Sequence, residues 1–169
     1  MFNPVTTETS HSANCFYHFS STLNTHCLKY YLENPTLNDK IHCLVNVIRA
    51  DKIALIPDNI IKKMKAVRDA ASKMGIPQVV FLTRVDQLCI MTENNLQNIY
   101  KSKRIREIIR KCSYTLGVPT NCIFPVCNYH EETGINEDIN CLMLDALTQI
   151  VDWANDYVVK CSNKQNQVE

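Results

Sequence analysis

Three polar side chains follow directly on the apolar run Val79–Leu82, namely Thr83, Arg84 and Asp86. A carboxylate at the end of a strand can accept hydrogen bonds from two neighbouring N–H groups, and the N1–H and exocyclic amine of guanine form such a pair. Adenine lacks these two donors, so a contact of this kind discriminates between the bases. A guanidinium group two residues earlier can stack on the flat ring. The segment therefore indicates either guanine recognition by Asp86 and Arg84 or a turn that Asp86 caps while Arg84 is solvated.

A thiol and an imidazole lie close together further along the chain, at Cys127 and His130. Such a pair can generate a thiolate nucleophile, which makes an α/β enzyme using Cys127 an alternative interpretation. The sequence offers no identifiable third residue to orient the imidazole. We therefore regard this alternative as poor.

The elements that would position these residues are alternating strands and amphipathic helices. Short apolar runs at 41–48, 78–83 and 122–126 predict strands, and the first run, IHCLVNVI, is typical of a strand buried on both faces. Pro125 suits an edge strand, because proline has no N–H to donate to a neighbour. Apolar residues at helical spacing predict helices from Asp58 to a stop at Gly75, over 101–117 and over 137–159.

This order predicts an α/β fold with parallel strands joined by right-handed crossovers. We expect one such domain over residues 39–160, a poorly defined segment over 1–38 and a frayed tail over 161–169. Ligands of such sheets bind beyond the carboxyl ends of the strands. The segments 83–86 and 127–132 follow adjacent predicted strands at such ends, so we expect them to face one another.

The order Thr83-Arg84-Val85-Asp86 also matches Asn/Thr-Lys-x-Asp, the guanine-specificity motif of GTPases, with Arg in place of Lys. The companion motifs for phosphate are missing. The chain has three glycines, Gly75, Gly117 and Gly134, and none completes Gly-x-x-x-x-Gly-Lys-Ser/Thr or Asp-x-x-Gly. We therefore expect weak binding of GTP or GDP at most, no catalytic residue, and no enzymatic activity for this chain.

Composition limits the classes of partner. The net charge is +1, which gives no reason to expect nucleic acid or a membrane as a partner. No apolar run approaches the roughly 20 residues of a membrane span, and none follows the first Met as in a secretory signal.

Nine cysteines without a Cys-x-x-Cys pair predict reduced thiols in the cytoplasm. The basic run at 101–111 is typical of a solvated helix face, with a site for a partner or an anion as the alternative. We expect no metal site, because the potential ligands near the N-terminus fit no zinc pattern; they are His11, Cys15, His18, His26 and Cys27.

Several segments in order resemble the interferon-induced protein 44 family. They are NPTLNDKIHCLVNVIRADKI at 34–53, the Met- and Lys-containing helix after it, LTRVDQL at 82–88 and VCNY at 126–129. The resemblance covers about residues 34–159 and concerns the C-terminal part of that family's GTPase-like domain. It implies a cytoplasmic, interferon-responsive protein of antiviral immunity that has protein partners in innate immune signalling.

The resemblance also implies a fold and a set of site residues. The fold would be a three-layer, P-loop-NTPase-like parallel sheet, here an incomplete half that lacks the strand leading into the phosphate loop. Thr83, Arg84 and Asp86 would fall on the base-recognition motif. Cys127, Asn128 and Tyr129 would fall on the loop that touches guanine from the other side, usually through a backbone N–H.

An incomplete half of this kind would leave the strand at 41–48 without its usual neighbour. We expect either that the N-terminal segment covers that edge or that the chain is a truncated form of a larger protein. An exposed edge is also a route to self-association. The alternative function is a GTP-binding protein or GTPase whose phosphate-binding part lies in upstream sequence.

Overall fold

A computed structural model describes residues 34–130 and 132–165 of the chain. The chain divides into two units, residues 1–40 and 41–169. In the described part of the first unit, Leu37–Asp39 forms a single 3-10 turn, η2. The backbone N–H and the hydroxyl of Thr36 both donate to the Asp39 carboxylate, at 2.9 and 2.6 Å, and these hydrogen bonds lower the pKa of Asp39. The candidate ligands from His11 to Cys27 lie outside the described residues.

The second unit contains a sheet of three parallel strands in the order β1-β2-β3. The strands are β1 (Leu44–Arg49), β2 (Gln78–Thr83) and β3 (Ile123–Pro125). This arrangement confirms the predicted α/β class with three adjacent parallel strands. Strand β1 begins three residues later than predicted. The N–H of Leu44 donates to the carbonyl oxygen of Pro77 at 2.9 Å, and Pro77 has no N–H with which to extend the ladder further back.

Three long helices connect or follow the strands, as the periodicity predicted. They are α2 (Asp58–Lys73), α4 (Lys103–Leu116) and α5 (Glu137–Gln165). Helix α4 begins where the Ser102 hydroxyl accepts from the N–H of Ile105, and it ends at Gly117, which adopts a left-handed φ of 73°. Helix α5 continues through 161–165, part of the segment that we expected to be a frayed tail. Since no Gly or Pro follows Val159, nothing in the sequence stops the helix there.

The connection from β2 to α4 is more structured than its polar sequence indicated. It contains three short elements in succession: η4 (Asp86–Leu88), α3 (Ile90–Asn94) and η5 (Leu96–Lys101). Two further 3-10 segments flank strands: η3 (Ala50–Leu55) follows β1, and η6 (Thr120–Cys122) precedes β3.

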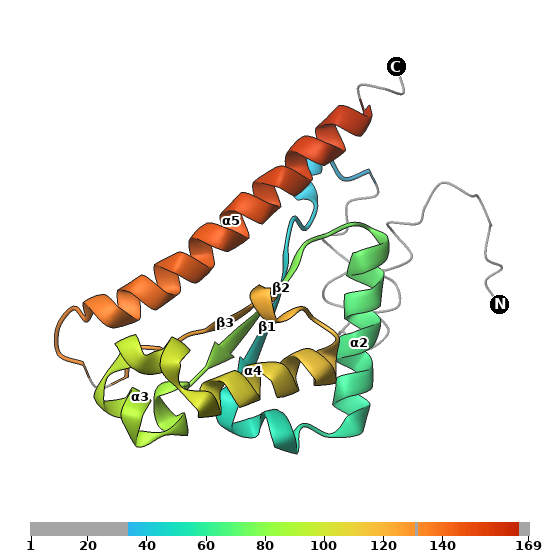
Figure 1. The fold of residues 1–169 in the computed structure, drawn as a ribbon. Helices are drawn as coiled ribbons and strands as arrows, with labels where there is room; N and C mark the ends of the chain where they lie inside the picture. The colour runs from blue at the N-terminus through green and yellow to red at the C-terminus, as the bar shows by residue number, and fades with distance from the viewer. Residues whose placement is uncertain (1–33, 131, 166–169) are drawn as a thin grey trace. The chain divides into compact units, whose positions relative to one another are not determined.

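Helices cover the two faces of the sheet (Figure 1). Because side chains alternate along a strand, Val80 and Leu82 face one way and Phe81 the other. Helix α4 contributes Ile105, Ile108 and Cys112 to the core around Val80 and Leu82, and Met64 of α2 packs against that core. On the opposite face, Ala146 of α5 packs with Phe81 and Val126.

Strand β1 is not buried on both faces, so that prediction was wrong. Ile48 faces the α2–α4 core, whereas Val45 and Val47 on the other face are 36% and 67% exposed. Val47 lies in register with Phe81, but the packing of α5 on this face is centred on Phe81, Phe124 and Val126. An apolar run cannot tell whether the neighbouring helix reaches far enough to cover it.

No helix in residues 34–130 and 132–165 combines the length and the apolar character needed to span a bilayer. The cysteines in these ranges are all free thiols.

Candidate functional site

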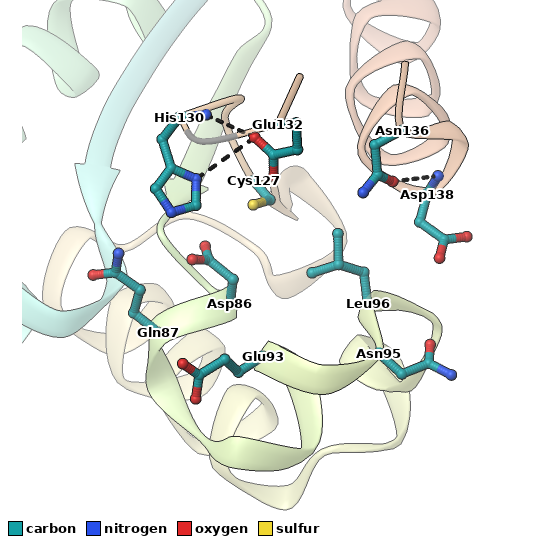
Figure 2. A pocket seen from close by; sticks show the side chains of 10 residues that line it. All are labelled: Asp86, Gln87, Glu93, Asn95, Leu96, Cys127, His130, Glu132, Asn136 and Asp138. Carbon is teal, nitrogen blue, oxygen red and sulfur yellow. Dashed lines mark hydrogen bonds and ion pairs between the residues drawn. The ribbon is translucent and has the colours of Figure 1, made fainter. Parts of the chain in front are cut away.

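The carboxyl ends of β2 and β3 lie side by side, because Leu82 pairs with Pro125 and the N–H of Val126 donates to the carbonyl oxygen of Leu82 at 2.9 Å. The loops that follow these strands therefore leave the sheet next to each other. Between them is a pocket of about 400 Å³ (Figure 2). Its lining residues are Asp86, Gln87, Glu93, Asn95, Leu96, Cys127, His130, Glu132, Asn136 and Asp138. The expectation that the two loops face one another is confirmed.

Asp86 reaches this pocket through an unusual turn. Arg84 has a φ of 60°, a left-handed conformation that side chains with a Cβ rarely adopt. The turn sends Val85 back into the core, where it is fully buried, and leaves Asp86 at the start of η4. Asp86 thus points into the pocket at the carboxyl end of a strand (Figure 2).

A buried polar cluster supports the turn from below. The Thr92 hydroxyl is completely buried and is within donating distance of the carbonyl oxygens of Val85, Asp86 and Cys89, at 3.1, 3.5 and 3.0 Å. The Cys89 sulfur lies 3.3 Å from the Thr92 oxygen and 3.5 Å from the Ser102 hydroxyl. These hydrogen bonds, first that of Thr92, lower the pKa of Cys89. The cluster fixes the backbone on both sides of Asp86.

Cys127 lines the pocket from the loop after β3 and is only 3% exposed. Burial raises the pKa of its thiol to about 12, with further contributions from a hydrogen bond to Asp86 and from the negative charges of Asp86 and Glu132. A thiol held in this protonated form is a poor nucleophile. The surroundings of the thiol therefore do not favour Cys127 as a nucleophile, and they place it next to the Asp86 carboxylate.

Four carboxylic side chains face the pocket, from Asp86, Glu93, Glu132 and Asp138. The His130 backbone N–H donates to Glu132 at 2.8 Å, and its ring nitrogen Nδ1 lies 3.7 Å from the same oxygen. This lining favours a ligand that presents N–H donors, and it repels phosphate groups.

The other expected site residues lie around the pocket but do not line it. The Thr83 hydroxyl donates to the carbonyl oxygen of Ile48 at 3.4 Å, so this side chain ties β2 to β1. Arg84 is half-buried and Asn128 is exposed. The Tyr129 hydroxyl accepts from the N–H of Asn136 at 2.8 Å and lies 2.9 Å from the Asn140 amide oxygen. Tyr129 therefore fastens its loop to the start of α5.

Sequence reasoning missed the residues that complete the pocket, notably Glu93, Asn95 and Asp138. Glu93 and Asn95 come from the short helical turns after β2, which read as an irregular polar stretch. Asp138 is placed by Asn136, whose side-chain oxygen accepts from the N–H groups of Asp138 and Ile139 at 3.1 and 3.2 Å and so caps α5. An Asn three residues before an apolar helix position was the available signal.

Comparison with known proteins gives the chain a set of relatives. It is 29% identical to interferon-induced protein 44 of Homo sapiens over 128 residues, which are 76% of this chain and 29% of that protein. Over the same length it is 28% identical to interferon-induced protein 44 of Mus musculus and 27% identical to interferon-induced protein 44-like of Homo sapiens. The chain spans less than a third of the length of these relatives. No family model and no solved structure matches. The resemblance that the sequence segments indicated is confirmed.

Proposed function

We propose that this chain, a relative of the interferon-induced protein 44 family, is an interferon-responsive protein of innate immunity with a vestigial guanine site. The names of its relatives support the first part of this proposal. We also propose that the domain is P-loop-NTPase-like and that, among the described residues, it lacks the strand that would lead into the phosphate loop. The free thiols of the described residues support a cytoplasmic location and, with it, protein partners in antiviral signalling.

The observation that carries the guanine proposal is the position of Asp86. It follows β2 at the carboxyl edge of the sheet and points into a pocket that the loop after β3 completes. Its carboxylate is the acceptor for the N1–H and exocyclic amine of guanine. The remaining carboxylates repel phosphates, so the base enters the pocket and the sugar and phosphates remain outside.

The flanking residues have supporting roles in this proposal. Arg84 does not line the pocket, so the proposal requires its side chain to rotate and bring the guanidinium over the base. The loop at Cys127, Asn128 and Tyr129 offers its backbone N–H groups to the guanine carbonyl oxygen. Thr83 keeps the strand end in place through its hydrogen bond to Ile48.

The site holds only a base, so binding is weak and the chain does not hydrolyse nucleotides. One bidentate contact and partial stacking correspond to roughly −4 kcal/mol, a Kd on the order of 1 mM. Phosphoryl transfer requires loop N–H groups, a lysine and magnesium around the phosphates, and the sequence has no motif for them.

A titration of the ¹⁵N-labelled chain with GDP and with ADP, followed by NMR, tests the proposal. We expect millimolar binding of GDP that shifts the amides of 84–89 and 126–130, and weaker binding of ADP. Asp86→Ala should remove the difference while the rest of the spectrum is unchanged. Equal binding of both nucleotides by the unmutated chain would refute the role of Asp86. In a parallel assay with GTP and magnesium we expect no phosphate release above the rate without protein.

A further inference from the structure

Charge is unevenly distributed over the two faces of the sheet. Helix α2 contains five Lys or Arg and two Asp, and α4 contains five Lys or Arg and one Glu. These two helices on one face thus hold ten of the 18 basic residues of the chain. Helix α5, on the opposite face, contains five acidic and two basic residues. The net charge of +1 conceals this segregation.

The outer side of α4 is the centre of the basic surface. Lys103, Glu107, Arg110 and Tyr114 follow one another at helical spacing and form its outermost row. Further cations flank this row; they are Arg104, Arg106 and Lys111, all exposed. Glu107 pairs with Arg104 at 3.9 Å and offsets one of the five positive charges of α4, so an excess of four remains.

These cations do not serve the stability of α4. Positive side chains stabilise a helix near its C-terminus and destabilise it near its N-terminus, by about 0.3–1 kcal/mol each. In α4 the first turn has no acidic residue, and Lys103, Arg104 and Arg106 lie near this end; the last turn has no basic residue. A charge pattern that opposes the helix dipole indicates that the cations have a role outside the fold.

Tyr114 adds a second kind of contact. Its side chain is 90% exposed and lies one turn from Arg110 and Lys111. A large aromatic ring among cations on a rigid helix is the combination that binds single-stranded nucleic acid, where bases stack on the ring and phosphates pair with the cations. A lipid surface fits less well, because the apolar stripe of α4 is buried in the core and cannot insert; it comprises Ile105, Ile108, Cys112 and Leu116.

We propose that the outer face of α4 binds single-stranded nucleic acid. Arg106, Arg110 and Lys111 hold the phosphates, and Tyr114 stacks on an unpaired base. The surface is separate from the pocket at Asp86, so the proposal does not depend on guanine binding.

Fluorescence anisotropy of a labelled 15-nucleotide oligouridylate with the full chain tests the proposal. Three phosphate contacts on a single strand give a slope of log K against log salt of about −2, and therefore about 20-fold weaker binding at 200 than at 50 mM salt. The double variant Arg110→Gln, Lys111→Gln should bind about tenfold more weakly at 50 mM salt. Its matched control, Lys160→Gln with Lys164→Gln on α5, should bind like the unmutated chain.

Tyr114 separates stacking from simple charge attraction. Tyr114→Ala should lose fivefold or more in affinity for the oligouridylate, Tyr114→Phe should retain it, and inorganic polyphosphate should bind all three proteins equally. The proposal concerns phosphates and bases, which DNA and RNA share. Equal binding of single-stranded DNA and RNA therefore supports it. The proposal is overturned if the oligouridylate does not bind at 50 mM salt, or if duplex RNA binds more tightly than the single strand. It is also overturned if phosphatidylserine vesicles bind and the oligouridylate does not.

Discussion

The hydroxyl of Thr92 lies 3.1 Å from the carbonyl oxygen of Val85, to which it donates a hydrogen bond beneath the turn that presents Asp86. Thr92 is completely buried, so Thr92→Val keeps the shape of the side chain but leaves the carbonyl oxygens around it without this donor. An unmet buried acceptor costs about 1–3 kcal/mol. We expect a loss of this size in urea unfolding and faster amide exchange over 85–89. Thr92→Ser retains the hydroxyl and is the control; equal stabilities of the two variants would contradict the role of the hydrogen bond.

Arg84 carries the second constraint on this turn, its φ of 60°. Glycine adopts this conformation without a steric penalty, whereas an L-residue with a Cβ pays roughly 1–2 kcal/mol. Because glycine also gains entropy in the unfolded chain, we expect Arg84→Gly to change the free energy of unfolding by less than about 1 kcal/mol. Arg84→Val, with a branched Cβ, should be clearly destabilising. Denaturant unfolding of both variants measures this, and a larger loss for the glycine variant would show that the guanidinium itself stabilises the fold.

Two buried thiols make stability depend on alkaline pH. Burial raises the pKa of Cys112 to about 11, and burial together with Asp86 raises that of Cys127 to about 12. Below about pH 9 each thiol is protonated in both folded and unfolded chains, so its contribution is constant. Above pH 9 only the unfolded chain releases the proton, and each thiol lowers stability by about 1.4 kcal/mol per pH unit until the folded pKa is reached.

Other groups titrate in the same range, so the test compares slopes. We expect the free energy of unfolding of Cys112→Ala to fall less steeply than that of the unmutated chain between pH 9 and 10.5. The exposed Cys141 provides the control, and Cys141→Ala should follow the unmutated chain. Identical slopes for all three proteins would show that Cys112 does not hold its proton in the folded state.

The edge of β1 opposite β2, which pairs with no strand among the described residues, leads to a prediction about association. Leu44 directs its N–H toward β2, and backbone groups alternate along a strand, so the N–H and C=O of Val45 and Val47 point away from the sheet. Among the described residues no strand pairs with this edge. We expect concentration-dependent self-association in sedimentation experiments, and Val47→Lys should suppress it, since a lysine on an edge disfavours strand addition.

Leu55→Lys is a suitable control for this prediction, because Leu55 is similarly exposed, at 68% against 67% for Val47, but lies outside the sheet. It should associate like the unmutated chain. Association that survives in Val47→Lys would mean that another surface is responsible.

The sequence was sufficient to predict the sheet and the long helices, because Val79–Leu82 and the stripe from Ile105 to Leu116 show their periods clearly. The sequence wrongly predicted that Val45 and Val47 are buried. Their hydrophobicity indicates a preference for burial, but it does not show whether α5 extends far enough to cover them. The left-handed turn at Arg84 has no signature in the sequence, and Asn136 indicates only where α5 begins, so the path of the loops could not be predicted.

The site was predicted in the same partial way. Asp86 and the loop at Cys127 were expected to meet, because parallel strands must end at the same edge. The acidic lining from Glu93, Glu132 and Asp138 was not foreseen, because these residues belong to three separate segments. The basic surface on α4 was read as solvated, since neither net charge nor a single run of sequence shows that α2 and α4 lie on the same face.

The most direct test of the guanine site is a change of base preference in Asp86→Asn. The asparagine amide retains an oxygen for the N1–H of the base but replaces the second acceptor by a donor. It therefore clashes with the exocyclic amine of guanine and matches the oxygen that xanthine carries at that position. NMR titrations of both proteins with GDP and xanthosine diphosphate should show GDP preferred by the unmutated chain and xanthosine diphosphate preferred by Asp86→Asn, each by about tenfold. An unchanged ratio of the two affinities would contradict the proposal that Asp86 recognises guanine.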